Sequence, residues 1–78
     1  MENKTIRRTL YRVLRKTGVP RKEIELDAAF DEDLNFDHVD WALFLFYLEE
    51  CFKINVQDEE VSRMRQVKDT LNMMETMA

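Results

Sequence analysis

The sequence predicts an all-α fold, a small four-helix bundle with three main helices and a short third one. The 78 residues contain one glycine and one proline, whereas folds made of strands and tight turns need many such residues. Apolar residues recur at helical spacing in several segments, and the most apolar of these, residues 39–52, contains neither glycine nor proline. At this length we expect one domain over residues 1–78.

The first helix is expected over Thr5–Thr17. Gly18 follows as a natural residue for the left-handed end of a helix, and Pro20 prevents the helix from continuing. Residues 21–33 then form a long loop. The apolar residues that should face the core are Ile6, Leu10, Val13 and Leu14 from the helix and Ile24, Leu26 and Phe30 from the loop.

The second helix is expected over Val39–Phe52. Asp37 is a good N-cap for it, and Asp40 lies in the first turn, where a carboxylate suits the helix dipole.

On a helical wheel, the stripe that should face the core consists of Trp41, Phe44, Leu45, Leu48, Cys51 and Phe52. The opposite, polar side carries His38, Glu49, Glu50 and Lys53. Four apolar residues lie among these polar ones, namely Val39, Ala42, Leu43 and Phe46. Such residues are either covered by a neighbouring segment or exposed to a partner.

Two shorter helices complete the predicted fold. Asp58–Met64 suits a short third helix with Asp58 as its N-cap. Gln66–Met74 suits the fourth helix. The residues of this helix that should face the core are Val67, Leu71 and Met74. The residues expected at a frayed end are Met73, Met77 and Ala78.

Charge is distributed unevenly along the chain. Residues 1–22 hold eight basic residues against Glu2, whereas residues 23–78 carry a net charge of −11, and the whole chain has a net charge of −4. The basic first helix offers a surface for nucleic acid, or for the acidic second helix of another copy of the chain. Because such faces are more often solvated or paired with acids of the same protein, nucleic acid is not the expected partner.

The sequence contains no catalytic constellation, so we expect no enzyme. Its one histidine and one cysteine are thirteen residues apart on the second predicted helix and cannot meet, and its one serine lies on the third. The common catalytic and phosphate-binding motifs are missing. Asp37, His38 and Asp40 offer metal-ligating atoms, but such a trio is more often an exposed helix start, so no metal is expected. The longest apolar run, Trp41–Leu48, is too short to span a membrane, and no secretory signal is recognisable, so we expect a cytoplasmic protein.

A further pattern lies in the order of short motifs along the chain: Phe30, Glu32-Asp33-Leu34, Asp37-His38-Val39-Asp40, Leu48-Glu49-Glu50 and Phe52. This order resembles the acyl carrier protein family, over nearly the whole chain, and implies that family's four-helix fold. In the family, the motif Glu-Asp-Leu-Gly-x-Asp-Ser-Leu places a serine at the start of the second helix, and this serine carries the phosphopantetheine arm. Here the motif reads Glu32-Asp33-Leu34-Asn35-Phe36-Asp37-His38-Val39, so the serine position is His38.

The histidine at this position determines the functional prediction. Attachment of the arm forms a phosphodiester and needs a hydroxyl group, which imidazole lacks. The only serine, Ser62, lies far from the motif, and so do the threonines. We therefore expect phosphopantetheine to be absent and no other cofactor to take its place.

The resemblance also implies a docking surface, because partner enzymes of the family bind the second helix. The matching apolar positions are Val39, Ala42 and Phe46, and the acidic ones are Asp37, Asp40, Glu49 and Glu50. Leu43 stands where the family often has an acid. The predicted function is a non-catalytic interaction or regulatory module whose partner has a basic-rimmed apolar groove, for example an enzyme of fatty-acid or polyketide synthesis. Two alternatives stay open: an acyl carrier with unusual attachment chemistry, or a nucleic-acid-binding domain that uses the basic first helix.

Overall fold

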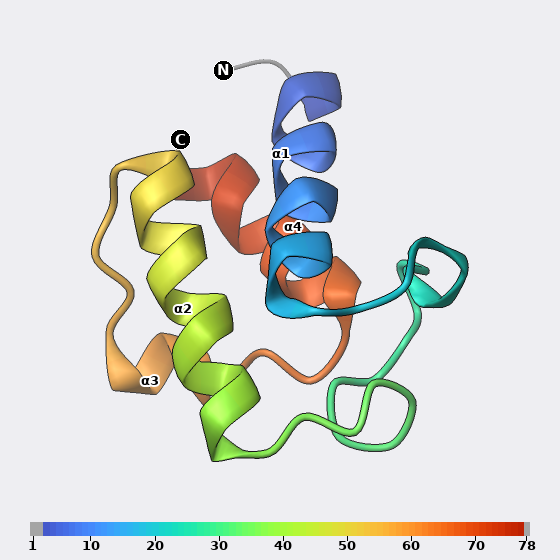
Figure 1. Cartoon of the computed structure of the whole chain (residues 1–78). Helices are drawn as coiled ribbons and strands as arrows, with labels where there is room; N and C mark the ends of the chain where they lie inside the picture. The colour runs from blue at the N-terminus through green and yellow to red at the C-terminus, as the bar shows by residue number, and fades with distance from the viewer. Residues whose placement is uncertain (1–2, 78) are drawn as a thin grey trace.

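The computed structural model describes residues 3–77, which form four α-helices and one short 3-10 helix. In chain order these are α1 (Asn3–Thr17), η1 (Arg21–Glu23), α2 (His38–Phe52), α3 (Asp58–Val61) and α4 (Val67–Met77). Figure 1 shows α1 and α2 side by side, with α4 packed behind α1 and α3 in the connection between α2 and α4. The described residues contain only one isolated β-bridge and no strand, so the predicted small all-α four-helix bundle is confirmed.

Helix α1 forms as predicted and starts at Asn3, slightly earlier than expected. Its end follows from Gly18, whose φ of 114° lies in the left-handed region that favours glycine. The Val19 N–H donates to the Leu14 carbonyl over 3.0 Å, which is the closing bond typical of helices with a glycine after the last turn. Pro20 then turns the chain into η1.

Helix α2 begins one residue before the predicted start and ends at Phe52 as predicted. Lys53 closes it in the left-handed conformation, with φ of 57°. The N–H groups of Lys53 and Ile54 both donate to the Glu49 carbonyl, the latter over 3.2 Å. These two bonds hold Lys53 in a conformation that costs a non-glycine residue about 1–2 kcal/mol.

The loop between α1 and α2 is tied to the connection between α3 and α4. The Phe30 N–H donates to the Arg65 carbonyl over 3.0 Å, and the Val67 N–H donates to the Ala28 carbonyl over 3.0 Å. The residues between these two bonds form the isolated antiparallel bridge. Two segments that are far apart in the sequence are thereby joined through their backbones.

The apolar residues of the long loop fold inward, as predicted. Phe30 and Ile24 are buried and Leu26 is half-buried. Phe30 belongs to an aromatic cluster with Phe36, Trp41 and Phe44, whose neighbouring ring centroids lie 4.8–5.9 Å apart in tilted or edge-on arrangements. Such pairs contribute about 0.5–1.5 kcal/mol each beyond area burial. The cluster fixes the loop beneath the first turns of α2.

The predicted third helix was wrong in its N-cap and its length. The cap is Gln57 rather than Asp58, and the Gln57 N–H donates to the Glu60 carboxylate over 3.0 Å. The helix ends after one turn at Val61. Hydrogen-bonded turns then carry the chain through Met64 to its backbone bridge with the long loop.

The predicted fourth helix was right in its inward face and wrong in its end. The Asp69 carboxylate accepts a hydrogen bond from the Gln66 N–H over 2.9 Å, which makes Gln66 the residue before the helix rather than its first residue. The helix continues through Met77 instead of fraying after Met74, and Met73 is half-buried against the core. The expectation for Ala78 lies outside the described residues.

The core lies between α1, α2 and α4. The core residues predicted for α1 and α4 are all buried, whereas three of the six predicted for α2, Trp41, Leu45 and Cys51, are only half-buried. The fully buried apolar side chains of these helices are Ile6, Leu10, Val13, Leu14, Phe44, Leu48, Val67 and Met74. Phe52 and Leu71 are also buried. Thr70 is the polar exception, because its hydroxyl oxygen is buried without a hydrogen-bond partner. No helix of the described residues is long and apolar enough to cross a membrane.

Candidate functional site

The start of α2 is held by a reciprocal pair of carboxylates. The Asp40 N–H donates to Asp37 Oδ1 over 2.9 Å, and the Asp37 N–H donates to Asp40 Oδ2 over 3.2 Å. Asp37 is therefore the N-cap, as predicted, and Asp40 completes a capping box. Both carboxylates are thereby fixed at the positive end of the helix dipole, where negative charge is stabilising.

The hydrogen bonds of this cap change the acidity of Asp37. Donation by the Asp40 N–H holds the pKa of the Asp37 carboxyl below its ordinary value of 3.8. The Val39 N–H and the nearby charge of His38 act in the same direction. Asp37 is therefore ionised at neutral pH and contributes a permanent negative charge beside His38.

His38 is the first residue of α2, and its side chain is exposed. It occupies the position that the sequence pattern matches to the arm-bearing serine, and it offers ring nitrogens instead of a hydroxyl oxygen. Ser62, the only serine, lies just after α3 and donates its hydroxyl to the Glu59 carbonyl over 2.7 Å. The chain thus presents an imidazole, not a hydroxyl, at the head of the central helix.

One side of α2 leaves large apolar side chains in solvent. The exposed fractions are 54% for Val39, 41% for Leu43 and 57% for Phe46, and Ala42 between them is also exposed. We call these four residues the apolar face of α2. Ala42, Leu43 and Phe46 follow Val39 by three, four and seven residues, so the four residues form one continuous stripe along the helix. The sequence left open whether a neighbouring segment covers them, and within the described residues none does so.

The acidic residues around the apolar face differ in their exposure and in their hydrogen bonds. Asp37 and Glu50 are exposed, whereas Asp40 and Glu49 are half-buried. Asp40 is engaged in the cap, and the Glu49 carboxylate accepts a hydrogen bond from the Val56 N–H over 2.7 Å. Glu49 therefore also fixes the loop after α2, a role that its place on the polar side of the wheel did not indicate.

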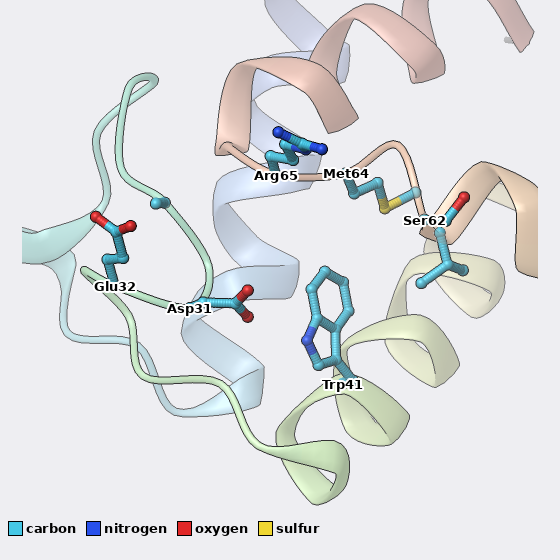
Figure 2. A pocket seen from close by; sticks show the side chains of 8 residues that line it. Asp31, Glu32, Trp41, Ser62, Met64 and Arg65 are labelled. Carbon is cyan, nitrogen blue, oxygen red and sulfur yellow. The ribbon is translucent and has the colours of Figure 1, made fainter.

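A hollow of about 560 Å³ opens on another side of α2, next to Trp41. Figure 2 shows the indole projecting from α2 into this hollow, with Asp31 on the side of the long loop and Met64 and Arg65 on the opposite wall. Ser62 also contributes to the wall. The wheel assigned Trp41 to the core stripe, but the indole is only half-buried, because one side of it lines this hollow. Sequence reasoning did not find this hollow, since its walls come from segments that meet only in the fold.

Within residues 3–77, no group of three or more histidine, cysteine, aspartate or glutamate side chains is arranged to hold a metal ion. One carboxylate oxygen of Asp37 and one of Asp40 accept backbone N–H groups in the cap, as described above. Cys51 is a free, half-buried thiol on the stripe that packs against the core.

Several known proteins are similar to the chain, and each is named acyl carrier protein. The one from Helicobacter hepaticus is 35% identical over 63 residues, which cover 81% of this chain and 83% of its own length. The one from Kocuria rhizophila is 30% identical over 60 residues, 77% of this chain and 74% of its own length. The one from an Arthrobacter strain is 33% identical over 57 residues, 73% and 70% of the two chains. No family model matches the chain. The chain belongs to the acyl carrier protein family.

This member of the acyl carrier protein family has the four-helix framework that the sequence pattern implied. Its relatives are named as carriers and not as catalysts. Of the eight residues predicted for partner binding, six are exposed on or just before α2, namely Asp37, Val39, Ala42, Leu43, Phe46 and Glu50. The other two, Asp40 and Glu49, lie on the same helix and are partly used by the fold itself.

Proposed function

We propose that this member of the acyl carrier protein family is a protein-interaction module that docks through the apolar face of α2 and carries no phosphopantetheine arm. It would act as a scaffold or regulator rather than as a carrier. The proposed setting is the cytoplasm, in fatty-acid or polyketide-type metabolism.

The exposure of Phe46 and Val39 carries this proposal. Both side chains are more than half exposed, although the chain buries comparable side chains completely elsewhere on the same helix. A contiguous apolar stripe on a small domain is typical of a binding surface. Burial of these side chains in a partner's groove would remove apolar area from water, which is the dominant favourable term in most associations.

The acidic residues beside this stripe support a partner of defined charge. Asp37 at one end of the stripe and Glu50 at the other are exposed, and Asp37 is ionised at neutral pH. A groove with basic residues on its rim would be attracted and oriented by these charges, which affect association rate and orientation more than affinity. The partner is thus proposed to have an apolar groove with a basic rim.

The imidazole of His38 supports the absence of the arm. Transfer of phosphopantetheine to a carrier forms a phosphodiester with a hydroxyl oxygen, and the first turn of α2 contains no serine, threonine or tyrosine. The relatives are named acyl carrier protein. The role proposed for this chain differs from the one in that name because His38 stands at the arm-bearing position.

Two measurements test the proposal. Immobilised chain should retain a specific protein from a lysate of the source cell, and Phe46→Glu should abolish that retention. The control is Met77→Glu, which introduces the same charge at an exposed apolar residue on α4 and should leave retention unchanged. Equal retention by wild type and Phe46→Glu would refute the docking surface.

In the second measurement, intact mass is recorded after incubation with coenzyme A and a phosphopantetheinyl transferase. A gain of one arm on the wild-type chain would refute the non-carrier role.

A further inference from the structure

Four arginines surround a second hollow, which lies on α1 and is separate from the apolar face of α2. Arg8, Arg12 and Arg15 come from α1 and Arg21 from η1, and together they line a hollow of about 540 Å³. The remaining lining residues are Tyr11 and Ile24. Figure 1 shows the chain leaving the end of α1 on the side opposite α2, toward η1. The hollow therefore shares no residue with the docking surface proposed above.

The convergence of these arginines follows from the local fold. Arg8, Arg12 and Arg15 are spaced by four and three residues, so they share one face of α1, away from its buried stripe. The turn at Gly18 and Pro20 reverses the chain and brings η1 back toward that face. The buried side chain of Ile24, just after η1, anchors this segment, so Arg21 is held beside the helix rather than left on a free loop.

The lining of this hollow is positively charged. The residues that line it include four arginines and no acidic residue. Four cations around one hollow repel each other, and a bound anion would relieve that repulsion. Guanidinium groups present paired N–H donors that match phosphate oxygens in bidentate geometry. The ring of Tyr11, half-buried at the wall, adds a flat surface on which a planar group can stack.

We propose that the arginine hollow binds a small organic diphosphate with a planar ring, of the nucleoside diphosphate class. The phosphates would contact the arginines and the ring would pack on Tyr11. The volume of the hollow lies within the range of small-molecule sites. A long polyanion fits less well, because residues 23–78 carry a net charge of −11 and would repel any part of it that extends beyond the hollow.

Binding of ADP, pyrophosphate and adenosine to the full chain, measured by titration calorimetry at an ionic strength of about 0.15 M, tests this site. We expect ADP and pyrophosphate to bind with one-to-one stoichiometry, and ADP to bind more tightly because of its ring. Arg12→Gln and Arg15→Gln should each weaken ADP binding about tenfold or more, the usual effect of losing a charge-assisted contact. The matched control is Arg7→Gln, which removes the same charge from an exposed position of α1 outside the hollow and should change ADP affinity less than about twofold.

The role of Tyr11 and the independence of the site have their own tests. Tyr11→Leu should remove the difference between ADP and pyrophosphate while leaving pyrophosphate affinity unchanged, and circular dichroism will confirm that each variant is folded. Phe46→Glu should bind ADP as wild type does, so failure of the docking proposal and failure of this one are distinguishable. Three results would overturn the inference: no binding of ADP or pyrophosphate, an equal loss in Arg7→Gln, or binding of a single-stranded oligonucleotide or anionic vesicles in the absence of ADP binding.

Discussion

Phe44 and Phe46 are the same residue type two positions apart on α2, and their environments are opposite. Phe44 is completely buried in the aromatic cluster, whereas Phe46 is 57% exposed. Phe44→Ala should lower the free energy of unfolding by about 3–5 kcal/mol, the usual cost of removing a buried phenyl ring. This is much of the stability of a chain of this size, about 4–12 kcal/mol. Phe46→Ala should lower it by about 1 kcal/mol or less.

The same pair predicts the opposite order for partner binding. Complete burial of a phenylalanine side chain is worth about 1.5–3 kcal/mol, and the exposed part of Phe46 is somewhat more than half of that residue. Burial of this part in a partner would contribute about 1–2 kcal/mol. Phe46→Ala should therefore raise the Kd of the complex about 5- to 30-fold.

Chemical denaturation followed by circular dichroism gives the stability of both variants, and titration calorimetry against the retained partner gives the Kd of wild type and Phe46→Ala. The reasoning is refuted if Phe46→Ala binds the partner with wild-type affinity. It is refuted equally if Phe46→Ala destabilises the chain as strongly as Phe44→Ala, because Phe46 would then be part of the core.

Three further predictions concern single groups. His38→Ser should accept one phosphopantetheine arm from coenzyme A and a transferase, because it supplies the missing hydroxyl at the start of α2; an unchanged intact mass would contradict this. Asp37→Ala should lower the thermal midpoint at neutral pH. Since the pKa of Asp37 is depressed in the fold, the carboxylate's contribution is complete above its ordinary value of 3.8 and is lost as pH falls through the lower folded value, so the two melting curves should converge in acid. Thr70→Val should raise the free energy of unfolding by about 1 kcal/mol in a denaturant titration, because it replaces a buried hydroxyl that has no hydrogen-bond partner with a methyl group; a loss of stability would show that the hydroxyl is satisfied.

Local signals in the sequence predicted the elements whose ends are determined locally. The Gly18 end of α1 and the Asp37 cap of α2 depend on residues within a few positions, so they could be predicted from the chain. The backbone bridge between the long loop and the connection before α4 could not, because it joins segments that are far apart in the sequence. The cap at Gln57 was missed for another reason: Asp58 is the better N-cap by residue type, but Glu60 is correctly spaced to pair with Gln57.

The candidate site likewise has features that could be predicted from the sequence and features that depend on the fold. The wheel placed Val39 and Phe46 opposite the core stripe, but only the fold shows that both side chains are exposed. The hydrogen bond from the Val56 N–H to Glu49 depends on the path of the chain after Lys53. The arginine hollow likewise depends on the path of the chain after Pro20, which places Arg21 beside α1. The spacing of apolar residues does not determine the path of either segment, so neither contact could be predicted from the sequence.

The backbone bonds from Phe30 to Arg65 and from Val67 to Ala28 have a consequence for the space beside Trp41. They connect the segments that form two of its walls, so these walls must move together as one body. Any widening to admit a bulky group would have to come from movement of α2, which bears the indole, or of the α3 segment with Val61 and Ser62. Because Trp41 is the only tryptophan of the chain, its fluorescence would report such a displacement without interference from another fluorophore of its kind.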